Sequence, residues 1–159
     1  MIMVSSCLLG IYSRYDGGAN TIPLLTKYLK TGKILPICPE QLGGLATPRR
    51  PVEIAGGAGV DVLDGSAKAI TPDGDDVSSS FVKGAQEVLA IARAFPVTAA
   101  ILKERSPSCG VHKIYDGSFN HVVREGQGVT AGLLRQLGVP LYSEDDLTEE
   151  LLQKLLDRS

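Results

Sequence analysis

The sequence predicts an α/β fold: a single Rossmann-like, three-layer domain with a mainly parallel sheet and a hairpin insertion. Three observations lead to this fold class. Short apolar runs alternate with segments of helical periodicity, which is typical of βαβ units with helices on both faces of a parallel sheet. A turn-like middle segment suits an antiparallel insertion. No internal repeat or linker interrupts the chain, so we interpret residues 1–159 as one domain.

Four short apolar runs are predicted to form the parallel strands: residues 2–6, 34–39, 97–102 and 139–142. Pro36 lacks an amide hydrogen, so the second run suits an edge position. Four segments of helical spacing lie between and after the strands: residues 22–32, 77–94, 129–137 and 147–155. The helix over 77–94 has the clearest periodicity. Asp75 and Asp76 precede it, where the helix dipole favours negative charge.

The middle of the chain carries the hairpin prediction. Val60–Leu63 and Lys68–Thr71 flank Asp64-Gly65, a dipeptide typical of tight hairpin turns. Residues 114–117 predict a second turn or short hairpin. The run Gly56–Gly59 lacks the G-x-G-x-x-G spacing of a dinucleotide site, so we expect a flexible loop there that could cover a substrate.

Composition and charge exclude several classes of protein. Hydrophobic residues make up 43% of the chain, which excludes a disordered or fibrous protein. Lys and Arg number 16 and Asp and Glu 18, a net charge of −2, so no basic excess favours nucleic acid. No apolar run approaches the ~20 residues of a membrane span, and the start lacks the basic region of a signal peptide. We therefore expect a cytoplasmic monomer or weak homodimer with no nucleic-acid or membrane partner.

The three cysteines, Cys7, Cys38 and Cys109, form neither a C-x-x-C pair nor an even set for disulfides. Taken singly, each suits a buried apolar position. Each also lies at or just after the carboxyl end of a predicted strand, and ligands of α/β sheets bind beyond these ends. Three thiols at that edge suit a soft metal, whereas structural zinc needs a fourth ligand, for which only His112 and His121 offer nitrogen. In an iron cluster, three cysteines leave one iron open to substrate.

Five motifs make the sequence similar to a known family. They are Ser5-Ser6-Cys7-Leu8-Leu9-Gly10, Arg14-Tyr15-Asp16-Gly17-Gly18, Cys38-Pro39-Glu40, Thr47-Pro48-Arg49-Arg50-Pro51-Val52-Glu53-Ile54 and Lys103-Glu104-Arg105-Ser106-Pro107-Ser108-Cys109-Gly110. In this order, over nearly the whole chain, they resemble the thiouracil desulfidase family of small bacterial iron–sulfur proteins. The resemblance implies a 4Fe–4S cluster held by Cys7, Cys38 and Cys109. It also implies removal of sulfur from a small thiolated pyrimidine, with the iron that no cysteine ligates binding the substrate sulfur.

The same resemblance implies roles for two polar residues, and two more are expected to line the site. Glu40 matches the acid/base glutamate and Ser106 the assisting serine, while Asp16 and Ser108 are expected to bind substrate. General chemistry agrees for Glu40, because exchange of C=S for C=O needs a group that moves protons between water and substrate. The alternatives are helix capping for Glu40 and turn formation for Asp16 and the two serines.

Two other functions use these residues differently. A non-catalytic iron–sulfur protein, such as a redox sensor or a sulfur carrier, needs the three cysteines but makes no demand on Glu40 or Ser106. A nucleotide-binding α/β domain with inert thiols needs none of them. Arg49 and Arg50 are either a surface pair or anchors for the loop beside the cluster.

Overall fold

The computed structural model describes all residues from 1 to 159. Its centre is a four-stranded parallel sheet in the order β2-β1-β5-β8. The strands are β1 (Ile2–Ser5), β2 (Ile34–Ile37), β5 (Ala99–Leu102) and β8 (Leu141–Ser143). The chain runs from β1 to β2 on one side and then crosses to β5 on the other, so the strand order reverses at β1. This confirms the parallel sheet, and Pro36 lies on an edge strand as predicted.

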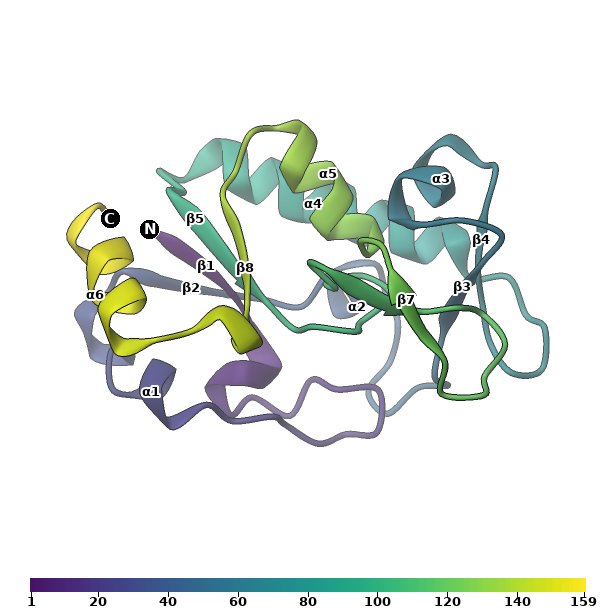
Figure 1. Cartoon of the computed structure of the whole chain (residues 1–159), viewed down its shortest axis with the longest axis horizontal. Helices are drawn as coiled ribbons and strands as arrows, with labels where there is room; N and C mark the ends of the chain where they lie inside the picture. The colour runs from purple at the N-terminus through teal and green to yellow at the C-terminus, as the bar shows by residue number, and fades with distance from the viewer.

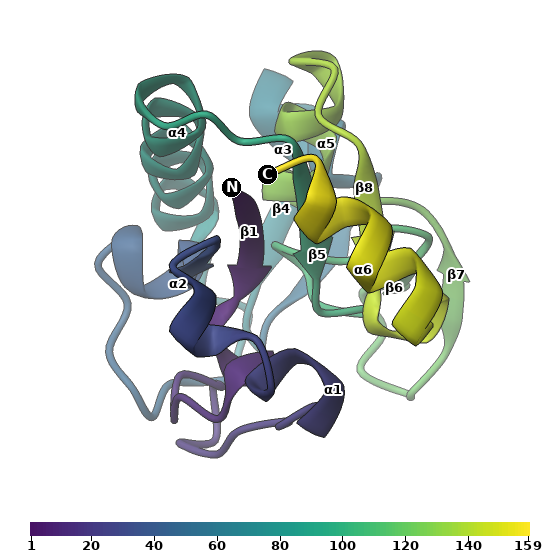
Figure 2. The same ribbon diagram turned by 90° about the vertical axis from the view of Figure 1, so that its left-hand side faces the viewer.

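Helices cover both faces of the sheet (Figure 1, Figure 2). They are α4 (Ser78–Ala94) and α5 (Val129–Gln136) on one face, and α1 (Pro23–Thr26) and α6 (Glu149–Asp157) on the other. Successive side chains of β1 point to opposite faces. Ile2 and Val4 therefore belong to the core cluster with α1 and α6, and Met3 to the cluster with α4 and α5. The three-layer architecture is confirmed.

The helix expected over residues 22–32 is interrupted. α1 ends at Thr26, and only a 3₁₀ turn (Leu29–Thr31) follows before β2. Leu29 is 42% exposed, so its apolar side chain gives the predicted helix no packing there. The hydroxyl groups of Thr26 and Thr31 donate to the carbonyl oxygens of Pro23 and Tyr28, at 3.0 and 2.7 Å. Such local hydrogen bonds favour turns over a continuous helix.

The hairpin expected around Asp64-Gly65 is wrong in its pairing. Residues 59–64 form helix α3 (Gly59–Asp64), and β4 (Lys68–Ile70) pairs antiparallel with β3 (Glu53–Ala55) instead. The glycine that suggested a hairpin turn has the left-handed φ of +86° that ends a helix. An antiparallel insertion is thus present, but the strand preceding Asp64-Gly65 in the prediction is a helix.

The segment Gly56–Gly59 also differs from the flexible loop that the sequence predicts. The Gly59 amide donates to the Gln127 carbonyl at 2.7 Å, and a Cβ on Gly59 would lie 2.2 Å from the Gly128 carbonyl oxygen. The residue therefore starts α3 in close contact with the start of α5. This segment is packed against the body of the protein and does not line the cavity described below.

A second antiparallel pair and a short helix complete the fold. β6 (Lys113–Tyr115) pairs with β7 (Val123–Glu125), so the turn expected at residues 114–117 lies in a hairpin with a longer connection. Helix α2 (Pro39–Leu42) follows β2. A third core cluster, which includes Ile54, Phe81 and Ile114, joins the insertion to α4 and β6. None of the helices combines the length and apolar character that a bilayer crossing requires.

Candidate functional site

The three cysteines lie beyond the carboxyl ends of three neighbouring strands. Cys7 is in a 3₁₀ turn directly after β1, Cys38 lies between β2 and α2, and Cys109 is in the loop after β5. All three are free thiols and line one cavity of ≈ 520 Å³. Because the strand order reverses at β1, this is the edge at which α/β sheets bind their ligands. The predicted convergence of the three thiols is therefore found.

Burial and mutual repulsion keep two of these thiols in the protonated form. Burial, and next the negative charge of Cys38, raises the pKa of Cys7 to about 11, although Lys103 and Arg14 act in the opposite direction. Burial also raises the pKa of Cys109 far above its usual value, against a hydrogen bond with Ser5 and with smaller contributions from the other two thiols. Three thiolates at this place need a positively charged centre among them.

The donor set fits a cluster better than a single ion. No three His, Cys, Asp or Glu side chains converge closely enough to chelate one metal ion. In a 4Fe–4S cluster each thiolate binds a different iron, so the thiols surround the cluster's volume instead of meeting at one point. Three soft donors around a cavity of ≈ 520 Å³ have that arrangement.

Close backbone contacts position the segments that carry Cys38 and Cys109. A Cβ on Gly84 of α4 would lie 2.0 Å from the Pro39 carbonyl oxygen, so α2 rests directly on α4. A Cβ on Gly128, which precedes α5, would lie 2.4 Å from the carbonyl carbon of Ser108. Larger side chains at these two glycines would displace one cysteine segment or the other.

Glu40 lies in the first turn of α2 and lines the cavity with the thiols. Arg49 Nε donates to Glu40 Oε2 at 2.6 Å, and Ser108 Oγ donates to Glu40 Oε1 at 2.7 Å. The Glu40 and Arg49 side chains are only 12% and 8% exposed. Both carboxylate oxygens therefore accept a hydrogen bond in a sheltered place, which fixes the orientation of the group.

Arg49 is an anchor, whereas Arg50 is a surface residue. Besides Glu40, Arg49 donates to Thr47 Oγ1 at 3.0 Å and to the Ser13 carbonyl at 2.9 Å. The Ser13 carbonyl also accepts from Cys38 Sγ at 3.7 Å, so Arg49 contacts the surroundings of a thiol from two sides. Arg50 pairs with Asp73 at the surface. The structure thus decides between the two alternatives left by the sequence, and differently for each arginine.

The two serines of the Cys109 loop have different contacts. Ser106 Oγ accepts from the amides of Ser108 and Cys109, at 3.2 and 3.1 Å, and its residue lines the cavity. Ser108 is 1% exposed and donates to Glu40. Its hydroxyl proton is therefore used by Glu40, while Ser108 also lines the cavity, so the substrate contact expected for Ser108 stays a prediction.

Asp16 lies outside the cavity wall. Its carboxylate pairs with Arg14 Nη2 at 2.9 Å, accepts from the Gly18 amide at 3.0 Å and is 45% exposed. Arg14 and Asn20 do line the cavity, and the Arg14 guanidinium donates to the Asn20 side chain. This carboxylate therefore contacts the cavity lining through Arg14, and the substrate contact expected for Asp16 stays a prediction.

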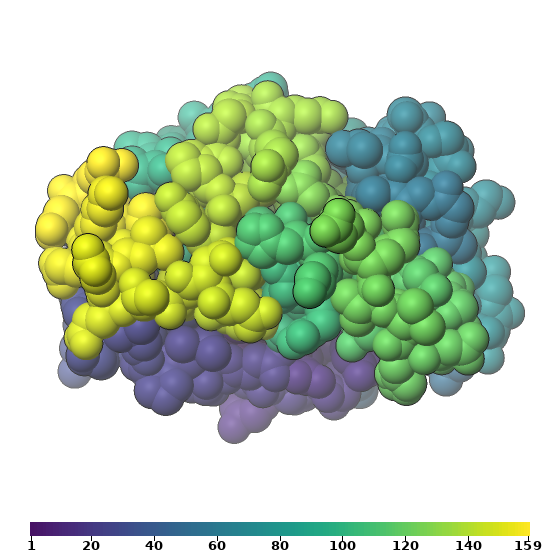
Figure 3. Space-filling model, in the orientation of Figure 1, coloured from purple at the N-terminus to yellow at the C-terminus, as the bar shows by residue number.

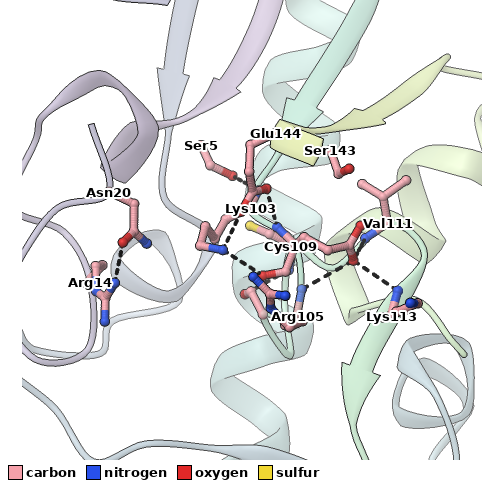
Figure 4. Close-up of polar contacts among 12 residues, drawn as sticks. Ser5, Arg14, Asn20, Lys103, Arg105, Cys109, Val111, Lys113, Ser143 and Glu144 are labelled. Carbon is pink, nitrogen blue, oxygen red and sulfur yellow. Dashed lines mark hydrogen bonds and ion pairs between the residues drawn. The ribbon is translucent and has the colours of Figure 1, made fainter. Parts of the chain in front are cut away.

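A partly buried network of acidic and basic side chains lies beside Cys109 (Figure 4), and its members Lys103 and Glu144 also act on the pKa of Cys7. Lys103 Nζ forms an ion pair with Glu144, and Glu144 Oε2 accepts from the Glu104 amide at 2.6 Å. Glu104 is 3% exposed and accepts from several amides of the chain that follows Cys109, including Lys113 at 2.9 Å. This network fixes the Cys109 loop. Sequence reasoning missed Glu104 and Glu144, because only the fold brings their partners to them.

The cavity has a further wall that the sequence did not predict. It is formed by Glu53 of β3 and by Tyr115, Phe119 and His121 of the β6–β7 hairpin. The hairpin signal was visible at Ile114–Gly117, but nothing in its sequence showed that the connection would face the thiols.

Fold and site together define a class of protein: a doubly wound α/β protein with a three-thiol centre and a fixed carboxylate at its switch point. Comparison with known proteins identifies the family of this chain. The family model described as 2-thiouracil desulfurase matches residues 2–146. The chain belongs to this family of sulfur-removing enzymes.

Two relatives match over nearly their whole length. A protein of Bacillus subtilis (strain 168), described as uncharacterized protein YbbK, is 47% identical over 151 residues, which are 95% of this chain and 100% of the relative. A solved structure described as the 4Fe–4S-dependent thiouracil desulfidase TudS is 41% identical with a TM-score of 0.85. The match covers 98% of this chain and 97% of that one.

Proposed function

We propose that this chain is a 4Fe–4S cluster-dependent desulfidase, which converts C=S to C=O in a small thiolated heterocycle such as thiouracil and releases sulfide. The observation that carries the proposal is the placement of three free thiols and the Glu40 carboxylate around one cavity at the switch point of the sheet. Membership of the 2-thiouracil desulfurase family and the 4Fe–4S dependence stated for TudS support it.

Cys7, Cys38 and Cys109 would hold the cluster, and each would do so as a thiolate. When bound, the cluster supplies one iron without a protein ligand, a Lewis acid for the sulfur of the substrate. Lys103 and Arg14 favour the thiolate of Cys7, and so reduce the electrostatic cost of gathering negative charge here. The proposal for these three ligands can be tested one residue at a time.

The net reaction is R₂C=S + H₂O → R₂C=O + H₂S. No atom changes its oxidation state, so the protein must move protons but needs no electron donor. We assign the proton transfer to Glu40, whose carboxylate takes a proton from water and returns it to the departing sulfur or to a ring nitrogen. Arg49 and Ser108 hold this carboxylate from either side. General acid–base catalysis of this kind contributes about 10²–10⁴-fold to the rate.

Ser106 is assigned a direct role and Ser108 and Asp16 indirect ones. The Ser106 oxygen accepts two amides, and its proton remains for a hydrogen bond to the substrate in the cavity. Ser108 positions Glu40, and Asp16 positions Arg14. These assignments stand beside the substrate contacts expected for Ser108 and Asp16, which stay predictions.

The wider setting is also part of the proposal. Residues 1–159 act as one domain, because the cavity is lined by segments from Ser5 to His121. A cavity of ≈ 520 Å³ suits a small heterocycle and not a nucleic-acid polymer. Three unpaired thiols suit the reducing cytoplasm. A monomer or weak homodimer remains the prediction for the assembly.

The test starts from protein purified without oxygen. Iron and acid-labile sulfide are measured first, and the protein is then incubated with 2-thiouracil while uracil and sulfide are followed. Glu40→Gln retains hydrogen-bonding capacity but loses the carboxylate, so the proposal expects full iron content and a loss of turnover of at least about 100-fold. Glu87→Gln, an exposed residue of α4, is the matched control.

Three results would overturn the proposal or one of its parts. Wild-type protein with a full cluster that releases neither uracil nor sulfide would favour the redox sensor or sulfur carrier. An active Glu40→Gln variant would remove Glu40 from the reaction. Protein without iron after anaerobic purification and reconstitution would reject the cluster itself.

A further inference from the structure

Three aromatic side chains face the cavity from outside the thiol-bearing loops. Tyr115 ends β6, and Phe119 and His121 lie in the connection from β6 to β7. Figure 3 shows this segment in green at the surface of the molecule, beside the blue atoms of the region that contains β3 and β4. Phe119 and Tyr115 are half-buried and His121 is exposed. The cavity therefore has aromatic surface that the thiol centre and Glu40 do not use.

The backbone of the cavity lining is strained at three residues, two of which belong to this wall. Arg105, Phe119 and His121 are the three non-glycine residues with positive φ, at 62°, 58° and 58°, and all three line the cavity. A bulky aromatic residue such as Phe rarely adopts this conformation. Strained residues persist only when their surroundings fix them, and they gather at functional sites.

Buried contacts fix this strained turn. Glu53 is 8% exposed, and its Oε2 accepts from the amides of Gly117 and Phe119, at 2.9 and 3.0 Å. Gly117 has a φ of +92°, and a Cβ there would lie 2.7 Å from the Ile54 carbonyl oxygen. The turn is therefore pressed against β3, and Phe119 keeps its place without having to pack into the core.

The aromatic rings also restrain one another. The Tyr115 and His121 rings meet edge to face, with their centroids 6.5 Å apart and their planes at 81°. By contrast, Phe81 is 1% exposed and belongs to the third core cluster. Phe119 belongs to no core cluster and has no such ring partner. Its half-buried ring is therefore available to the cavity.

We propose that Phe119, supported by the Tyr115–His121 pair, is the surface on which the flat ring of the substrate stacks. The inference rests on the proposed function, since it assigns the recognition of a planar heterocycle to the same cavity. Stacking on an aromatic face accepts any flat base, so this wall supplies affinity, while the thiol centre and Glu40 supply the chemistry. Glu53 is a positioning residue for the wall.

The experiment separates binding from turnover. Uracil serves as a probe because it has the ring of the substrate but no sulfur to lose. Its dissociation constant is measured by calorimetry under anaerobic conditions for the wild type, Phe119→Leu and Phe119→Tyr. Phe95→Leu is the matched control, because Phe95 is 46% exposed and lies outside the cavity. The KM and kcat for 2-thiouracil, the iron content and the melting temperature are measured on the same samples.

The proposal expects about tenfold weaker uracil binding and a KM raised by about the same factor in Phe119→Leu, with iron content unchanged. Phe119→Tyr keeps an aromatic face and retains uracil affinity within about twofold. Unchanged uracil affinity in Phe119→Leu, or a loss of kcat alone, overturns the proposal. If Phe119→Leu loses its fold, His121→Ala is used with the same expectations. A wild-type protein that binds uracil through Phe119 but does not desulfurise 2-thiouracil would reject the proposed function and leave this inference standing.

Discussion

Ser108 Oγ donates a hydrogen bond of 2.7 Å to Glu40 Oε1 and joins two residues that are 68 positions apart. Ser108 precedes Cys109, and Glu40 follows Cys38 by two residues. The bond therefore links two of the three cysteine segments through the carboxylate to which we assign proton transfer. The position of Glu40 thus depends on the Cys109 loop as well as on its own helix.

Removal of the Ser108 hydroxyl tests this link. In Ser108→Ala, Glu40 loses one of its two hydrogen bonds and becomes less well oriented. We expect an unchanged iron content and a kcat about tenfold lower, as for the loss of one hydrogen bond to a charged group. Turnover of 2-thiouracil and iron content are the measurements, with the exposed Ser79→Ala as the control. Wild-type kcat in Ser108→Ala would mean that the bond does not orient Glu40.

The two neighbouring arginines provide a matched pair of variants. Arg49→Met leaves the Glu40 carboxylate without its partner in a sheltered site, so we expect a loss of about 3 kcal/mol in the free energy of unfolding. Arg50→Met breaks only the exposed pair with Asp73, so its loss is expected to stay below about 1 kcal/mol. Urea unfolding of both variants measures the difference. Equal losses would contradict the distinction between anchor and surface residue.

The contact between α2 and α4 is tested by Gly84→Ala. The added methyl group would lie 2.0 Å from the Pro39 carbonyl oxygen, and backbone cannot move aside cheaply. We expect a loss of about 2–3 kcal/mol in the free energy of unfolding, together with weaker iron retention because Cys38 precedes α2. Glu87→Ala, on the exposed side of α4, is expected to change stability by less than about 0.5 kcal/mol. A stable Gly84→Ala variant with full iron content would rule out this role of the glycine.

Because of the Asp16–Arg14 pair, the free energy of unfolding is expected to differ between the wild type and Asp16→Asn in a pH-dependent way. The hydrogen bond from Arg14, and next that from the Gly18 amide, lowers the pKa of Asp16 below its usual 3.8. A carboxyl whose pKa is lower in the folded state stabilises the protein above its unfolded-state pKa, and this stability is lost as the pH falls through the folded-state pKa. Because the group is exposed, Asp16→Asn is expected to lose less than about 1 kcal/mol at pH 7.

Chemical unfolding of cluster-free protein from pH 7 to pH 2 measures this difference. The wild type and Asp16→Asn are expected to converge as the pH falls through the folded-state pKa of Asp16, below which the carboxyl is protonated in both states. Glu87→Gln, which lacks such a pair, is the control. A difference that stays constant down to pH 2 would show that the charge of Asp16 is not its cause.

Local patterns in the sequence are enough to predict the central sheet and the convergence of the thiols. Parallel strands and their connections follow from apolar runs and helical spacing, and the edge at which loops meet follows from topology. The same patterns mislead at Asp64-Gly65, because a left-handed glycine serves equally well as a hairpin turn and as the end of a helix. Only the packing of Val62 into the third core cluster decides for the helix.

The sequence motifs contain residues that line the cavity, but they do not show the relationships that depend on tertiary contacts. The resemblance placed Glu40 and the cysteines, which lie close together in the fold. No sequence pattern distinguishes Arg49 from Arg50, because the difference between them is the direction in which each side chain leaves the loop. Phe119 was missed for a similar reason: its φ and its exposure to the cavity are fixed by Glu53, 66 positions away.

The strands before the three thiols are adjacent in the order β2, β1, β5, and they are joined by backbone pairing and covered by two apolar layers. Strand pairing and the apolar core therefore hold the three thiol-bearing segments in place, without needing the cluster to do so. We therefore expect protein that has lost its iron to air to keep its fold, and to take up a cluster again when iron and sulfide are supplied.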